Sequence, residues 1–477
     1  MCGAGSGTYR EAVRNSTDPA VRRSRTGRID LYGALGAAIL VALAFVVPHL
    51  ADDRWRDSLY AAAAPIFGSW EPHWGWGTGP AIAIGVLVTV YGPGLAGRMS
   101  WRWLLPAVWL TALAWSFALA MVDGWQRGFA GRLTTGHEYL HEVGGVSSIG
   151  AMLRGFADRI LDFQPDSWTT HVSGHPPGAL LTFVLLDRAG LGGGTWAALV
   201  CTAVGCSAAV AVVVAIRALG APERARAVAP FLALAPAAIW LAVSADALFT
   251  GVSAWAVALL ALAVEPGRRR PAVAFGAGIL FGYSVYLNYG LILMAIPAAA
   301  VLMLRGVRGA WPAAVGALTV VALFTLSGFW WLDGYHLVVE RYYQGIATTR
   351  PASYWVWGNL AATVCAVGLA SAAGATRLSG NLGLPRSPRF SGSAAAALRD
   401  WRGRVDPAAL MAAAGLLALL VADISLLSKA ETERIWLPFD IWVLACTALL
   451  PVRTARRWLA VQVVGTLLIA HLILTNW

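Results

Sequence analysis

The stretch from Asp123 to Gly178 holds residue types that could do acid–base chemistry. Asp123 ends a long apolar run and precedes Gly124, so its carboxylate is predicted at a membrane–water boundary. A carboxylate there could take a proton from an acceptor hydroxyl, and burial near lipid would raise its pKa toward a useful range. The plainer interpretation is an acid that ends a helix before a glycine turn, and geometry alone favours it.

Two histidines, His171 and His175, lie just before Pro176-Pro177, which makes the following turn rigid. Their spacing resembles a metal-binding pair, but no helix is predicted here and no acid lies at metal-site spacing, so no metal site is predicted. A turn that presents one imidazole to a substrate is the better interpretation. Upstream, Glu138 is a second catalytic candidate and Tyr139 a binding candidate, although a solvated amphipathic segment explains both.

Further binding candidates lie in short segments between apolar runs. An acid beside lipid is costly unless it is used, which singles out Asp246, and Asn288 interrupts an apolar region in a similar way. Basic residues beside apolar runs could hold a phosphate, although they also anchor helices at the interface together with Trp. The substrate-binding candidates are His171, Tyr139, Asp246, Asn288, Arg341, Tyr342, Lys429, Glu431 and Arg434.

The elements that position these residues are predicted to be membrane-spanning helices. The 477 residues are 58% hydrophobic and 13% charged, about half the charged fraction of a soluble protein. The predicted fold is therefore all-α and polytopic, with about 13 spans. The apolar runs are 33–50, 79–97, 104–122, 193–216, 227–244, 248–264, 272–287, 291–304, 311–331, 357–374, 407–426, 435–450 and 458–475.

The basic residues predict the orientation of these spans. Lys and Arg concentrate in alternate short loops, which indicates an N-terminus inside and a C-terminus outside. Because the positive charge serves topology, nucleic acid is not a predicted partner despite the net charge of +11. The predicted divisions are a basic cytoplasmic tail (1–32), a transmembrane hairpin (33–103) and a catalytic domain (104–477). Its long outer loop (123–192) holds short amphipathic helices, and 178–188 is too short to span.

The motifs in this loop resemble those of the GT-C superfamily of polytopic membrane glycosyltransferases. Three features carry the resemblance: a span that ends in Val122-Asp123-Gly124, a long outer loop, and the turn Gly174-His175-Pro176-Pro177-Gly178 before an apolar helix. The composition, rich in Ala, Arg and Trp with Lys429 as the only lysine, resembles actinobacterial proteins that build arabinan and related cell-envelope glycans. The resemblance covers roughly residues 104–475.

The resemblance implies an activity: transfer of a sugar from a polyprenyl-phosphate donor to a glycan or glycolipid acceptor on the outer face of the plasma membrane. It implies that Asp123 is the base; His175 and Glu138 are the other catalytic candidates. Many members carry two adjacent acids at this position, and here the second is Gly124; Asp52-Asp53 is the reserve pair. No cofactor is predicted, and the sequence leaves open whether a divalent cation takes part. The alternatives are a transporter or flippase of a lipid-linked saccharide and a non-catalytic scaffold.

Overall fold

The apolar runs form helices, since a chain in hydrocarbon must satisfy its own backbone hydrogen bonds. A computed structural model describes residues 19–268, 270–384 and 393–476. In these ranges seven helices are long and apolar enough to cross a membrane, or nine if each of two bent pairs is one span, so by length and composition this is a multi-pass membrane protein. The seven lie in α2 (Pro19–Leu50), α4 (Thr78–Arg98), α5 (Trp101–Ala120), α10 (Gly194–Ala218), α13 (Ala245–Ala263), α18 (Ala352–Ala375) and α21 (Pro407–Ile424).

The other apolar runs form shorter or bent helices, and the count of about 13 spans stays a prediction. The predicted run 227–244 is divided because Pro236 lies between two helices and cannot continue the first one. The bent pairs turn by 75° after α16 and by 107° after η6. These elements are α11 (Pro222–Ala233), α12 (Ala238–Leu241), α14 (Pro271–Leu287), η4 (Tyr289–Met294), α15 (Ala295–Arg305), α16 (Trp311–Leu326), α17 (Trp331–Gln344), α23 (Leu437–Val443), η6 (Leu444–Leu449), η7 (Val452–Thr454) and α24 (Ala455–Leu472).

Proline and polar caps fix where several of these helices begin. Pro222, Pro271 and Pro407 occupy the first turn of α11, α14 and α21, where a missing N–H costs nothing. The Ser244 hydroxyl accepts a hydrogen bond from Ala247 N and so caps α13. The start of α13 is thereby fixed, and this start carries Asp246.

Close helix contacts depend on small residues. A side chain at Gly278 would overlap the Ala313 carbonyl oxygen, and one at Gly251 would overlap the Val204 carbonyl oxygen. These contacts bring α14 against α16 and α13 against α10. Packing through small residues is typical of helices in membranes, where burial of apolar surface gives no net driving force.

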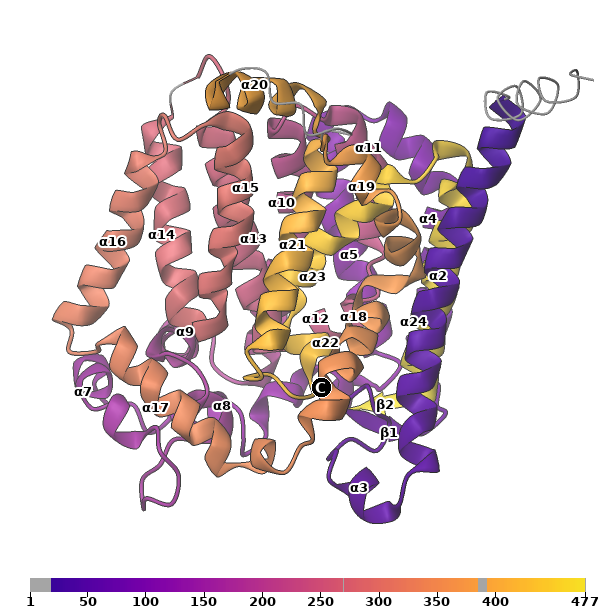
Figure 1. The fold of residues 1–477 in the computed structure, drawn as a ribbon. Coiled ribbons are helices and arrows are strands. Elements are labelled where there is room, and N and C mark those ends of the chain that lie inside the picture. Colours follow the sequence, from indigo (N-terminus) through magenta and orange to yellow (C-terminus); the bar gives the residue numbers. More distant parts are fainter. Residues whose placement is uncertain (1–18, 269, 385–392, 477) are drawn as a thin grey trace, which may run out of the picture.

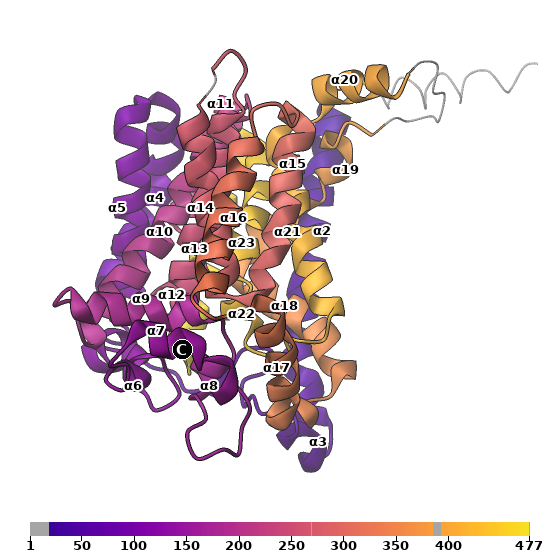
Figure 2. The same ribbon diagram turned by 90° about the vertical axis from the view of Figure 1, so that its left-hand side faces the viewer.

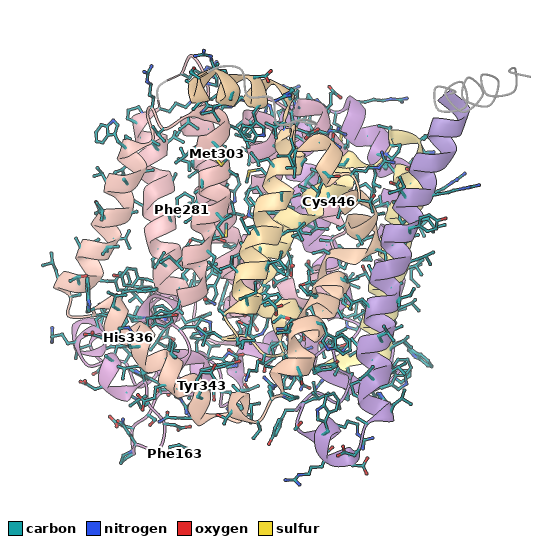
Figure 3. The ribbon with its side chains drawn as sticks, viewed as in Figure 1. Phe163, Phe281, Met303, His336, Tyr343 and Cys446 are labelled. Atoms are coloured by element: carbon teal, nitrogen blue, oxygen red, sulfur yellow. The ribbon has the colours of Figure 1, made fainter. Side chains whose placement is uncertain are left out.

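The short elements gather at the two ends of the helical bundle. One end carries α19 (Leu378–Asn381) and α20 (Ala394–Arg404), and Met303 of α15 lies toward it (Figures 1 and 3). His336 and Tyr343 of α17 and the tip residue Phe163 lie at the opposite end, here called the loop end (Figure 3). Its short elements are α3 (Asp53–Asp57), η1 (Gln126–Ala130), η2 (Arg132–Thr134), α6 (Leu140–Val143), α7 (Ile149–Arg154), η3 (Ala157–Arg159), α8 (Thr170–Ser173), α9 (Pro177–Arg188), η5 (Ile346–Thr348) and α22 (Thr432–Ile435).

Two short strands also lie at the loop end. β1 (Gly68–Trp70) pairs antiparallel with β2 (Ile473–Thr475), with Gly68 opposite Thr475. The strands connect the segment after α2 to the end of the chain, a contact that the sequence did not predict. Apart from them the described fold is helical, as expected.

The predicted divisions of the chain stay predictions. The tail 1–32 falls partly on residues 1–18, outside the described residues, and α2 begins at Pro19, before the expected start at 33. The segment 123–192 forms several short helices at the loop end, below α12 and α13 (Figure 2). Its last helix, α9, has 12 residues, fewer than the roughly 17–25 needed to span.

Candidate functional site

Glu138 lies at the loop end, buried among charged groups. It precedes α6, and its backbone N–H donates to the Thr135 carbonyl oxygen at 3.0 Å. Its residue exposure is 2%. Burial raises the pKa of this carboxyl to about 7, against the opposing attraction of the Arg434 charge. A carboxyl that titrates near neutrality can accept a proton and release it again at working pH.

Arg434 is the cation of this site. It lies in α22, which begins after Glu431, a residue with left-handed backbone (φ 63°). One guanidinium nitrogen pairs with Asp246 at 2.7 Å and the other with Glu431 at 3.4 Å. Burial by itself lowers the pKa of Arg434. The negative charges of three acids raise it by more, so that the net shift is upward; these acids are Asp246, Glu431 and Glu138. A permanently charged guanidinium is thus held at the centre of three acids.

Two histidines face the same group. His171 Nε2 lies 3.8 Å from Glu138 Oε1. The His171 backbone N–H donates to the His137 carbonyl oxygen, and this bond joins α8 to the segment just before Glu138. His175 Nδ1 donates to the His171 carbonyl oxygen at 2.8 Å. A carbonyl only accepts, so in the neutral ring His175 Nε2 is an acceptor. Burial lowers the pKa of both imidazoles and keeps them neutral.

Tyr139 completes the group of residues around Glu138. Two buried polar atoms in this group have no hydrogen-bond partner in the part of the chain that the structure describes. The Tyr139 ring lies 5.7 Å from His175 and stacks on Phe183 at 5.2 Å. The Tyr139 hydroxyl and Asp246 Oδ1 are buried and have no hydrogen-bond partner among the described residues. Buried polar atoms normally have one, so these two are candidates for substrate contact. The Glu138 cluster is Glu138, Tyr139, His171, His175, Asp246, Glu431 and Arg434.

The basic rim of the cluster is occupied by protein groups. Arg350 pairs with Glu431 at 3.2 Å and donates to the Lys429 carbonyl oxygen at 2.8 Å. Lys429 Nζ donates to the Ala347 carbonyl oxygen at 2.9 Å, and its backbone N–H donates to the Tyr342 hydroxyl. A phosphate at Lys429 or Tyr342 would therefore compete with contacts inside the protein.

Arg341 and Asn288 are two further binding candidates, and their contacts differ. Arg341 pairs with Asp162 and donates to the Ser173 hydroxyl of α8 at 3.2 Å, so it connects α17 to the histidine turn. The Asn288 side chain accepts from Gly290 N at 2.7 Å and caps η4. That contact explains Asn288 as a local cap, without a ligand.

Asp123 has its own partners. One carboxylate oxygen lies 2.8 Å from His73 Nε2 and the other 2.9 Å from an Arg132 guanidinium nitrogen. Arg132 also donates to the Thr475 carbonyl oxygen in β2. Burial lowers the pKa of Arg132 to about 10, although Asp123 opposes that shift. The Asp123 network, made of His73, Asp123 and Arg132, joins the segment after β1 to the segment after α5 and, through Arg132, to β2.

The reserve pair Asp52 and Asp53 makes exposed, local contacts. Asp52 Oδ1 accepts from Trp55 N at 3.0 Å and caps α3. Asp53 pairs with Arg56 at 2.7 Å, and its side chain is 83% exposed. Helix capping explains Asp52, and a local ion pair explains Asp53.

Arg350 and Glu433 are site residues that the sequence reasoning missed. Arg350 stands directly before Pro351 at the start of an apolar run, the position that singled out other basic residues. Glu433 accepts from Phe67 N at 2.9 Å, and burial raises its pKa to about 7. No local pattern marks Glu433, because its partner lies in another loop. Among the described residues no group of three or more His, Cys, Asp or Glu could hold a metal ion.

Comparisons with known proteins give weak likenesses only. No family model and no curated protein matches the chain. Two crystal structures of the oligosaccharyltransferase of Archaeoglobus fulgidus, one tethered to an acceptor peptide and one with Zn and sulfate, are each 16% identical. They cover 73% and 76% of this chain, at TM-scores of 0.39 and 0.38. The same archaeal enzyme, AglB, with an inhibitory peptide and a dolichol-phosphate is 14% identical, covers 77% and gives 0.34.

This chain spans about half the length of those archaeal chains, 49% to 51%. Likenesses of this size carry no argument about the fold or the activity of this chain.

Proposed function

We propose that this protein is a membrane glycosyltransferase. It transfers a sugar from a polyprenyl-phosphate donor to a cell-envelope glycan or glycolipid acceptor. The reaction takes place at the loop end, which faces the outside of the plasma membrane. The observation that supports this best is Glu138, a buried carboxyl that titrates near pH 7 beside two neutral imidazoles. Such a group suits general base catalysis on a hydroxyl.

Glu138 is the favoured base in this reaction, and Asp123 is its competitor. The Glu138 carboxylate takes the proton of the acceptor hydroxyl, and the hydroxyl oxygen attacks the anomeric carbon of the donor. The bond from that carbon to the phosphate oxygen breaks, and the lipid phosphate leaves with the electron pair. Both oxygens of Asp123 already bind partners, Arg132 and His73, which leaves them less available to a hydroxyl.

The donor phosphate is placed at the basic rim. Three basic residues lie around the cluster: Arg341 in α17, Arg350 just before α18, and Lys429 in the segment before α22. Charge-assisted hydrogen bonds from such groups would stabilise the negative charge that develops on the leaving phosphate. Each of these residues would exchange a protein acceptor for a phosphate oxygen when the donor binds. The apolar spans beside the rim would hold the lipid tail.

The alternative is a transporter or flippase of a lipid-linked saccharide. A transporter needs ionisable residues along a path through the bundle. Asp440 in α23 favours this alternative, because it is fully buried and neither carboxylate oxygen has a hydrogen-bond partner among the described residues. The Glu138 cluster favours the enzyme, since its acids, imidazoles and orphan polar atoms converge at one end. Net sugar transfer decides between the two.

The test measures sugar transfer by the purified protein in lipid nanodiscs, with a polyprenyl-phosphate sugar and an envelope glycan acceptor. Glu138→Gln should cut the rate by about 10²–10⁴-fold, because the proton acceptor is lost. The wild-type rate should rise as the pH increases through about 7, where Glu138 loses its proton. Glu142→Gln is the matched control: this acid lies four residues further along the chain, in α6, and contacts Thr169 N and Arg159.

One outcome would overturn the proposed activity, and another would overturn the proposed base. Absence of transfer by the wild type with every donor and acceptor pair, together with movement of a lipid-linked saccharide across vesicles, would favour the transporter. Normal transfer by Glu138→Gln with loss in Asp123→Asn would move the base to Asp123. Equal losses in Glu138→Gln and Glu142→Gln would indicate damage to α6.

A further inference from the structure

A cavity of about 310 Å³ lies next to the Glu138 cluster, at the loop end. It is formed where α6, α9 and the start of α10 meet. Its volume is at the lower end of the range of about 300–1,000 Å³ typical of small-molecule pockets. None of its lining residues belongs to the Glu138 cluster, so it is a separate site.

Close packing of the chain shapes this cavity. At the turn after α9, a side chain at Gly192 would overlap the Asp187 carboxylate, and one at Gly194 would overlap the Ala130 carbonyl oxygen. The Gly194 contact is with backbone, so only glycine allows it, whereas the Asp187 carboxylate could move aside for a side chain at Gly192. The turn therefore holds the backbone at the mouth of the cavity in one place, next to Asp187.

The chemistry of the lining selects its ligand. His141, Asp187 and Thr134 supply polar groups, and the rest of the lining is aliphatic or glycine apart from Phe183. No Lys or Arg lines the cavity, which disfavours a phosphate. A carboxylate accepts hydrogen bonds from hydroxyl groups, and aliphatic walls suit the C–H face of a ring. These properties fit an uncharged sugar ring.

The cavity is connected to the Glu138 cluster through one pair of stacked rings. Phe183 lines the cavity and stacks on Tyr139 at 5.2 Å, with 26° between the ring planes. The ring of Tyr139 in turn lies 6.2 Å from His171 and 5.7 Å from His175. The stacked rings of Phe183 and Tyr139 would therefore lie between a ligand in the cavity and the histidines of the Glu138 cluster.

We infer that this cavity binds one uncharged sugar ring of the acceptor glycan and so holds the acceptor next to Glu138. The inference rests on the proposed function for the identity of the ligand as an acceptor. Binding of the ring itself needs no turnover and can be measured alone. Asp187 and His141 fix the ring through its hydroxyls, while the aliphatic wall sets its face.

The experiment measures binding by saturation-transfer NMR on the full chain in nanodiscs, with methyl glycosides of hexoses and pentoses as probes. Nanodiscs are needed because alkyl glycoside detergents would compete for a sugar site. Gly144→Leu puts a bulky side chain beside the cavity, where a Cβ meets no atom within 4 Å. Asp187→Ala removes the carboxylate. Gly403→Leu is the matched control, an equally open glycine in α20 at the opposite end of the bundle.

The wild type should bind at least one methyl glycoside, and both Gly144→Leu and Asp187→Ala should weaken that binding about tenfold or more. Gly403→Leu should bind as the wild type does. Glu138→Gln should keep the binding while it loses transfer, which separates the two proposals. Failure of every glycoside to bind the wild type, or equal binding by the wild type and Gly144→Leu, would overturn this inference and leave the proposed function standing. Binding without transfer by the wild type would do the reverse.

Discussion

Asp123 and Glu138 are acids of the same segment, and their surroundings are opposite. Asp123 is held between Arg132 and His73, with one partner for each carboxylate oxygen. Glu138 is more deeply buried, with side-chain exposure of 3% against 11%, and this burial raises its pKa, with smaller contributions from the acids Asp246 and Glu431. A carboxylate in an ion pair serves the structure of the fold. A carboxyl whose ionisation is opposed by its surroundings has a raised pKa, which suits it to accept a proton in catalysis. Position in the sequence favoured Asp123 as the catalytic base, whereas the surroundings in the structure favour Glu138.

The largest expected effect concerns the ion pair at the centre of the Glu138 cluster. Arg434 and Asp246 are 4% and 2% exposed, so Arg434→Met leaves a buried acid without its cation. We expect a loss of about 3–5 kcal/mol in unfolding free energy. Denaturant unfolding of the purified protein measures it. Arg404→Ala is the control, because its pair with Asp400 is exposed and worth less than about 1 kcal/mol. Equal stability of Arg434→Met and the wild type would show that the cluster has no central ion pair.

The Asp123 network gives the second largest effect. Asp123→Asn leaves Arg132, a 9% exposed side chain, without its anion, and should lower the unfolding free energy by about 2–4 kcal/mol at pH 7. Transfer per folded molecule should change less than tenfold. Asp53→Asn, an exposed acid paired locally with Arg56, is the control and should change little. A stable Asp123→Asn variant with lost transfer would reverse the roles of the two acids.

The contrast also separates what the sequence could predict from what it could not. The pattern of apolar runs indicates helices, because burial follows a local periodicity, and costly charges beside lipid single out Asp246 and Arg434. Both lie in one cluster with His171, His175 and Glu138, which the sequence also named. The partners of Asp123 could not be predicted, because His73 lies in another loop and Arg132 on a turn that no periodicity marks. Glu433 was missed for the same reason.

The basic rim supplies a third, smaller effect. Lys429→Ala and Arg341→Ala should raise the KM for the donor lipid more than they change kcat, because each removes one charged hydrogen bond to the phosphate, about 1–3 kcal/mol. Steady-state kinetics with varied donor concentration separate the two constants. The control is Arg453→Ala in η7, an exposed basic residue away from the rim. Unchanged donor KM in both variants would indicate that Lys429 and Arg341 serve only Ala347 and Asp162.

The smallest expected effect is a change in stability with pH, and its direction follows from the pKa of Glu138. The pKa of Glu138 rises from the ordinary 4.5 to about 7 on folding, so between these values the folded protein binds more protons than the unfolded chain. Stability from this group is therefore present at pH 5 and is lost as the pH rises through about 7. Glu138→Gln removes that loss. It should match the wild type at pH 5 and exceed it by about 1–2 kcal/mol at pH 8.

Denaturant unfolding of both proteins across pH 5 to pH 8 measures this difference, with Asp123→Asn run beside them. Asp123→Asn should be less stable than the wild type at pH 8, because it breaks an ion pair, whereas Glu138→Gln should be more stable. Opposite signs at pH 8 would establish that one acid is held charged and the other is held near its point of ionisation. If Glu138→Gln also lost stability at pH 8, Glu138 would be a second structural anion held by Arg434. The chain would then lack a buried acid poised as a base in this segment.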